Sequence, residues 1–229
     1  MNVLLSVLGS AALALGACGG RDAQEVVDKE IPALKQRFGE YQTAVRAALA
    51  KPVAEPPKLP EKLFFPPLYT DGDKANALLI LPEWIEMPVK HDPDGLLSET
   101  LDIFIDVRDV AHGSPALGKA SIYDSRIAAF KNAKYLVLVT GHARGGIVAG
   151  STYSGGGYHG SLIFVDVAKS ASIGTIEVSA STADSVKVAV DSSHSVQRQL
   201  DYDAKQQAIE AINKALAPHL APGSRVPAS

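Results

Sequence analysis

The first seventeen residues of the chain carry no charge, and the only cysteine follows them at position 18. A helix of residues 3–17 rises by ~1.5 Å per residue, so it is too short for the ~30 Å hydrocarbon core of a bilayer. The run has instead the apolar core and small-residue end of a signal peptide, although no basic residue precedes it. We expect residues 1–17 to be removed, which leaves about 210 residues to fold without an intrachain disulfide.

The residues around the cysteine read Leu15-Gly16-Ala17-Cys18, a branched apolar residue and two small residues before the thiol. This resembles the lipobox of bacterial lipoproteins, and the resemblance covers only the N-terminal segment. It implies that Cys18 receives a lipid and holds the chain at a membrane, outside the cytoplasm. Gly19, rather than an aspartate, follows the cysteine. In a Gram-negative cell this implies the outer membrane, facing the periplasm.

The charge of the chain limits its partners. It has 25 acidic against 22 basic residues, for a net charge of -3. This balance supplies neither the basic footprint of a nucleic-acid-binding protein nor a polybasic patch for anionic lipids. We therefore expect no nucleic-acid partner, and we expect the membrane contact to be the lipid on Cys18.

The segment after the cysteine predicts an amphipathic helix within residues 18–50. Its apolar residues recur in alternating steps of four and three: Val27, Ile31, Leu34, Phe38, Tyr41, Val45 and Ala48. We expect the regular helix to begin at Pro32, because proline suits a first helical turn and disrupts an interior one. The same spacing suits a coiled-coil arm. Because the run is short for a coiled coil, we favour a helix docked on its own domain.

Prolines divide this helix from the rest of the chain. Residues 51–67 hold six of them, which predicts an extended linker. A domain is expected at residues 68–218 and a disordered tail at residues 219–229. The chain is thus expected to consist of a signal peptide, a tether with a helix, a linker, a domain and a tail.

The domain reads as α+β, with a mixed or mainly antiparallel sheet, flanking helices and a C-terminal helix. Strands are predicted at 77–81, 135–139, 161–167, 174–181 and 186–190, the third and fourth as a hairpin. Helices are predicted at 122–133 and 199–217. Asp201 is the expected cap of the last helix and Pro218 its stop. Residues 96–112 fit a strand or a helix, and their length favours the helix.

Residues 141–160 are the most unusual segment, rich in glycine and hydroxyl side chains between two predicted strands. We expect a long loop, since such loops often carry function. It contains the candidate ligand site, which consists of His142, Arg144, Tyr158 and His159. If the flanking strands pair, both histidines lie at one rim of the sheet. Asp166 or another carboxylate would then complete a metal site or a general base.

Other patterns fail as known motifs. Gly155, Gly157 and Gly160 match a dinucleotide-binding spacing, but a predicted strand follows them where a helix is needed. Residues 113–120 approach a P-loop, but Ala120 stands where a hydroxyl should hold magnesium. No serine has the Gly-x-Ser-x-Gly frame of a nucleophile elbow, and the histidines lack a metal-ligand spacing. We therefore expect neither a metal nor a cofactor.

Three functions remain open. The favoured one is a non-catalytic lipoprotein that binds or scaffolds another component of the cell envelope, with an envelope protein as candidate partner. The alternative is a lipid-anchored hydrolase or metal-binding enzyme that uses His142 and His159. A third is self-assembly through the apolar side of the helix at 27–48. Trp84 and Tyr158 are candidates for stacking on a sugar, although a single tryptophan is more often part of a core.

Overall fold

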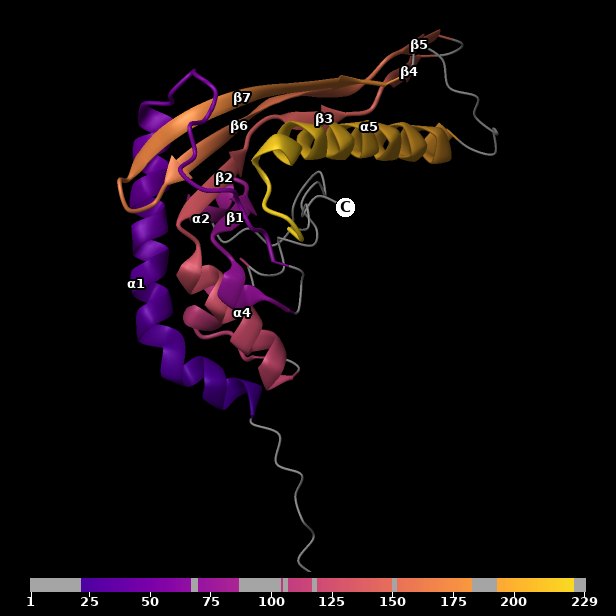
Figure 1. Cartoon of the computed structure of the whole chain (residues 1–229). Coiled ribbons are helices and arrows are strands. Elements are labelled where there is room, and N and C mark those ends of the chain that lie inside the picture. Colours follow the sequence, from indigo (N-terminus) through magenta and orange to yellow (C-terminus); the bar gives the residue numbers. More distant parts are fainter. Residues whose placement is uncertain are drawn as a thin grey trace, which may run out of the picture.

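The computed structural model describes residues 22–66, 70–86, 104, 107–116, 119–149, 152–182 and 193–224. Its architecture is α+β, as expected, with one open mixed sheet and helices packed around it (Figure 1). The expected signal peptide, Cys18 and the strand expected at 186–190 lie outside the described residues. Among the residues that are described, no helix combines the length and apolarity needed to cross a bilayer.

The main sheet has five strands in two directions. These are β1 (Ala77–Ile80), β2 (Tyr135–Val139), β3 (His142–Arg144), β6 (Gly157–Asp166) and β7 (Ala171–Ser181). β1 pairs in parallel with β2, whereas β6 runs antiparallel to β2, β3 and β7. Every residue of β1 and β2 is buried, which explains their continuous apolar runs. The predicted strands at 77–81 and 135–139 and the predicted hairpin are confirmed.

Four helices have described bounds: α1 (Ala23–Ala50), α2 (Glu83–Glu86), α4 (Ala120–Asn132) and α5 (Ser193–Leu216). Two short 3-10 helices, η1 (Gly72–Lys74) and η2 (Ala217–His219), accompany them. The described residues of the ambiguous segment, 104 and 107–111, are helical, in agreement with the favoured helix.

α1 is docked on the core of the chain itself, as predicted. The residues of its apolar side lie in the same buried cluster as the sheet, and Ile31 packs partly buried against that cluster. The expected start at Pro32 is wrong, because α1 begins at Ala23, where the Asp22 carboxylate accepts a hydrogen bond from the Gln24 amide. Pro32 withholds one donor from the helix. Burial of Val26 and Val27 before it accounts for the extra turns.

α1 also satisfies the C-terminal end of α4. The Tyr41 hydroxyl donates to the Phe130 carbonyl, and Arg37 donates to the Ala133 carbonyl. Carbonyls in the last turn of a helix have no partner within that helix, so these side chains supply the missing donors. The rings of Tyr41 and Phe130 meet edge to face at 5.0 Å. Burial raises the pKa of the Tyr41 hydroxyl to about 12, so it remains a donor at neutral pH.

The proline-rich segment lies along β7. The Thr175 amide donates to the Glu55 carbonyl at 2.8 Å, and Leu63 is fully buried. Residues 219–224, which fall in the expected tail, meet this segment: Leu220 pairs with Leu63, and Ser224 Oγ accepts from the Phe65 amide at 3.0 Å. The helix, the proline-rich segment and the sheet therefore contribute to one buried cluster.

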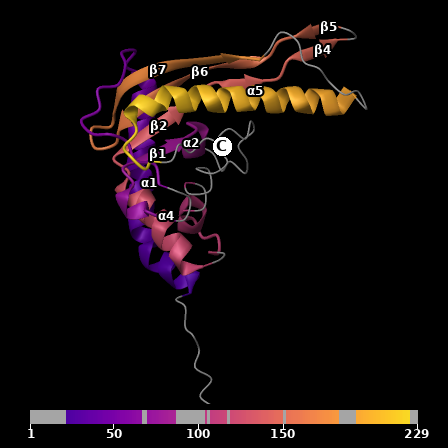
Figure 2. The same cartoon turned by 45° about the vertical axis from the view of Figure 1, so that its right-hand side comes forward.

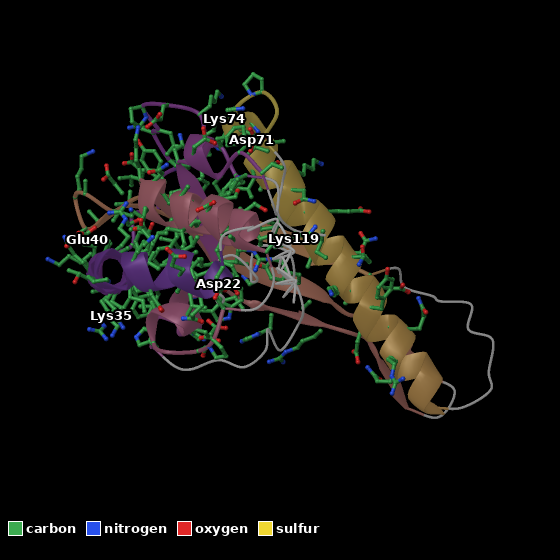
Figure 3. All side chains as sticks on the ribbon, turned by 90° about the horizontal axis from the view of Figure 1, so that it is seen from below. Asp22, Lys35, Glu40, Asp71, Lys74 and Lys119 are labelled. Atoms are coloured by element: carbon green, nitrogen blue, oxygen red, sulfur yellow. The ribbon has the colours of Figure 1, made fainter. Side chains whose placement is uncertain are left out.

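α5 runs alongside β3, β6 and β7, and together they extend past the rest of the molecule (Figures 1 and 2). We call this extension the arm and define it as residues 142–149, 152–161, 176–182 and 193–204. Seen from below, the arm projects away from the labelled charged residues of α1 and η1 (Figure 3). Asp201 lies inside α5, so its predicted role as a cap is wrong. The predicted stop is close, because α5 ends at Leu216 and Pro218 lies in η2.

The contact between α1 and α4 predicts a measurable cost for Tyr41→Phe. This change removes the buried donor to the Phe130 carbonyl and should lower the free energy of unfolding by about 1–3 kcal/mol. Tyr202→Phe is the matched control, because Tyr202 is 55% exposed on α5. It should stay within ~0.5 kcal/mol of the wild type. Denaturant unfolding of the three proteins measures both values, and equal values for the two variants would contradict the assigned contact.

Candidate functional site

The described residues of the glycine-rich segment, 141–149 and 152–160, form the outer part of one long antiparallel hairpin, and the expected loop is wrong. β2 and β6 pair Val139 with Leu162, and β3 and β6 pair His142 with His159. The next strands, β4 (Ile147–Ala149) and β5 (Thr152–Ser154), pair Ile147 with Ser154. All three ladders share the same register. The hairpin therefore continues without a shift from the buried core to its outer end.

Glycine stands opposite glycine along this hairpin. The shared register places Gly141 across from Gly160 and Gly145 across from Gly156. Gly141 has a φ of 91°, a left-handed conformation that favours glycine. A Cβ on Gly160 would lie 1.9 Å from the Thr140 carbonyl oxygen, so the backbone itself occupies the space of a side chain. These glycines allow close backbone packing within a ladder, whereas sequence patterns associate them with loops.

One face of the hairpin rests on α5. A Cβ on Gly145 would lie 2.1 Å from Asp201 Oδ1 and 2.8 Å from the Asp201 amide nitrogen. Gln197 Nε2 donates to the Gly146 carbonyl at 3.2 Å and to Asp201 Oδ1 at 3.0 Å. From the end of β7, Thr182 Oγ1 accepts a hydrogen bond from the Gly156 amide at 2.7 Å. Sequence reasoning missed these positioning residues, because none belongs to a recognisable motif.

The opposite face carries three of the four candidate residues. Residues paired directly across an antiparallel ladder share a face, and so do residues two apart on one strand. His142 and His159 are such a pair, and Arg144 follows two residues after His142. All three side chains are exposed. We call this set the basic face.

Tyr158 does not join the basic face. It pairs with Ala143 on the side that α5 covers, and it is 2% exposed. Its hydroxyl donates to the Thr140 carbonyl at 2.6 Å. Trp84, the other candidate for stacking on a sugar, is fully buried and stacks on Phe104. Neither ring is placed to receive a ligand from solvent.

A hollow of about 610 Å³ opens at the basic face. Five glycines and the three basic residues line it, with Tyr158 and Ala180, and none of these described lining residues is acidic. Within the described part of the chain, Arg144 takes part in no ion pair. On the neighbouring strand β7, Ser179 pairs with His159, and Ser181 with Gly157. The basic side chains that line the hollow therefore have hydroxyl side chains beside them on the neighbouring strand.

Asp166 is too far from the histidines to complete a metal site. It lies seven residues from His159 on β6, a separation of ~24 Å at ~3.4 Å per residue. Partial burial acts to raise the pKa of its carboxyl, but hydrogen bonds from the Lys169 side chain and amide outweigh burial and lower that pKa. Among the described residues, no cluster of three or more His, Cys, Asp or Glu side chains is arranged to hold a metal ion.

Comparison of this chain with protein-family models, with curated proteins and with solved structures found no match in any of the three. The site must therefore be interpreted from its own geometry. That geometry offers an exposed cationic surface on a rigidly paired ribbon.

The close packing of α5 against the hairpin predicts different outcomes for two Gly→Ala changes. Gly145→Ala places a methyl group against the Asp201 backbone and should cost ~1–3 kcal/mol of stability, with faster amide exchange in the first turns of α5. Gly155→Ala is the matched control, because its Cβ would lie 3.7 Å from Thr182 Oγ1, an ordinary contact. Hydrogen-exchange mass spectrometry of residues 193–204 compares them. Equal protection of these amides from exchange in both variants would contradict the close packing of Gly145 against α5.

Proposed function

We propose that this protein is a lipid-anchored, non-catalytic binding protein of the bacterial cell envelope, and that it engages its ligand through the arm. The anchor is supported by the residues Leu15-Gly16-Ala17-Cys18. The binding role is supported by one observation above all, the exposed basic face on a hairpin that projects from the body. A ligand site on paired strands is held in place by backbone hydrogen bonds, which suits recognition without a conformational change.

The position of α1 supports a role at a distance from the membrane. Only residues 19–21 separate the proposed lipid on Cys18 from Asp22, the N-cap of α1. α1 has 28 residues and is therefore ~42 Å long at ~1.5 Å per residue. Its first turn lies at the opposite end of the molecule from the arm (Figure 1). The helix thus separates the attachment point from the binding face by most of its length.

One observation favours the alternative, a metal-binding enzyme. Two histidines directly opposite each other on a ladder have Cβ atoms ~4.5–5.5 Å apart, a spacing that suits two ligands of one metal ion. The guanidinium of Arg144 beside them opposes a cation, and the described lining residues include no carboxylate. Ligand binding by the basic face is therefore the preferred function.

The anchor is tested by Cys18→Ser. The variant has no thiol to receive the lipid, so metabolic labelling with a fatty acid should be lost and the protein should leave the membrane fraction. Labelling and fractionation in a Gram-negative host measure this, with Ser6→Ala in the same segment as the control that keeps its lipid. A Cys18→Ser protein that remains labelled would refute the anchor.

The arm is tested by photo-crosslinking on native membranes. A crosslinking amino acid at Ser179, exposed beside His159 on the basic face, should yield a discrete adduct. The same amino acid at Lys35, exposed on α1 and away from the arm (Figure 3), is the control and should yield none. Adducts from Lys35 alone, or none from either site, would count against binding through the arm.

A further inference from the structure

We propose that the basic face binds a phosphate group, either free or carried by a larger molecule, between Arg144 and the imidazole N–H groups of His142 and His159. This inference rests on the proposed binding function and specifies its ligand. Three observations carry it, namely the convergence of three basic side chains, the absence of acidic residues among the described lining of the hollow, and the glycines that leave the hollow open.

The convergence follows from the ladder. His142 and His159 have Cβ atoms ~4.5–5.5 Å apart as a directly opposite pair. Arg144 stands two residues along the same strand, ~7 Å from His142 at ~3.4 Å per residue. A guanidinium on its long side chain spans that interval. It presents a planar fork of N–H groups that matches two oxygens of a phosphate.

The number of charges favours phosphate over a carboxylate. A phosphate monoester carries about −1.5 to −2 charges at pH 7, whereas a carboxylate carries one. One guanidinium suffices for a carboxylate, but the further oxygens of a phosphate gain from the N–H donors of the two imidazoles. Arg144 also disfavours a bound metal cation at the same place. The chemistry of the face is therefore that of an oxyanion site.

Two carboxylates of the described residues lie near the ribbon. On β7, Glu177 lies diagonal to His159 and is engaged by the Ser161 hydroxyl at 2.9 Å. On α5, Asp201 lies against Gly145, on the other face of the ribbon. The Ser179 side chain, on the row of the two histidines, adds a hydroxyl donor. Five glycines line the hollow without side chains that would block an anion.

The test uses the full lipid-bearing chain in a neutral detergent, titrated calorimetrically with inorganic phosphate and with sulfate. Arg144→Gln and the double variant His142→Gln/His159→Gln should each weaken phosphate binding about tenfold or more. Arg144→Lys, which keeps the charge but not the fork, should lose less. Lys35→Gln, on α1, makes the same charge change as Arg144→Gln and should bind as the wild type does. Unfolding midpoints establish that each variant is folded.

Sulfate is the second probe, because it is a tetrahedral dianion that offers the same oxygens to the basic face as phosphate does. The double histidine variant should weaken sulfate binding as it weakens phosphate binding. Sulfate and phosphate affinities that are unchanged in the double histidine variant would remove the imidazoles from the site.

Two soluble ligands identify the source of the phosphate. Glycerol phosphate represents a free phosphate ester, and a short-chain phosphatidic acid represents a lipid headgroup. The ligand with the higher affinity indicates the source of the phosphate. Phosphate affinity equal in the wild type and in Arg144→Gln would overturn the proposal. So would equimolar zinc that binds the wild type and is lost in the double histidine variant. If Ser179 gives crosslinks on native membranes but the protein does not bind phosphate, the phosphate inference fails and the proposed binding function stands.

Discussion

The register between β2 and β6 determines the position of almost everything in the arm. It is set in the core, where the five buried residues of β2 pair with residues 162–166 of β6 and close packing of side chains on both faces holds the pairing. The same register then continues through β3 and into β4 and β5. The register of the buried inner strands thus sets the pairing of the exposed outer strands. His142 meets His159 for this reason.

A hairpin of this length also needs support beyond its own ladder. β7 borders β6 along most of its length, and α5 covers the inner face as far as Gly145. The side chains of Gln197 and Thr182 form hydrogen bonds with the backbone of Gly146 and Gly156, where the ladder has no side chains of its own to pack. In the arm, α5 therefore covers one face of the sheet, and the polar face is exposed to solvent. The backbone beneath the basic face is already ordered by this support, so binding costs it little further conformational entropy.

The other end of the molecule has a different organisation. α1 packs along α4 and closes its C-terminal carbonyls through Tyr41 and Arg37, and the proline-rich segment returns along β7. These contacts join the first described helix firmly to the sheet. If Cys18 is lipidated, motion of the membrane anchor is transmitted through a helix that shares the core. The orientation of the arm relative to the attachment point is then a property of the fold.

Periodicity alone determined much of the fold. β2, the β6–β7 hairpin, α4, α5 and the docked side of α1 follow from apolar spacing, because burial acts on each of them locally and repeatedly. Only the tertiary structure decided the rest. The glycine-rich strands carry almost no apolar pattern, and their pairing is imposed by the core register and by α5. Pro32 remains inside α1 because Val26 and Val27, which precede it, are buried. The basic face exists because the two sides of one hairpin are paired in this register, and that pairing turned Tyr158 inward while it brought His142, Arg144 and His159 together.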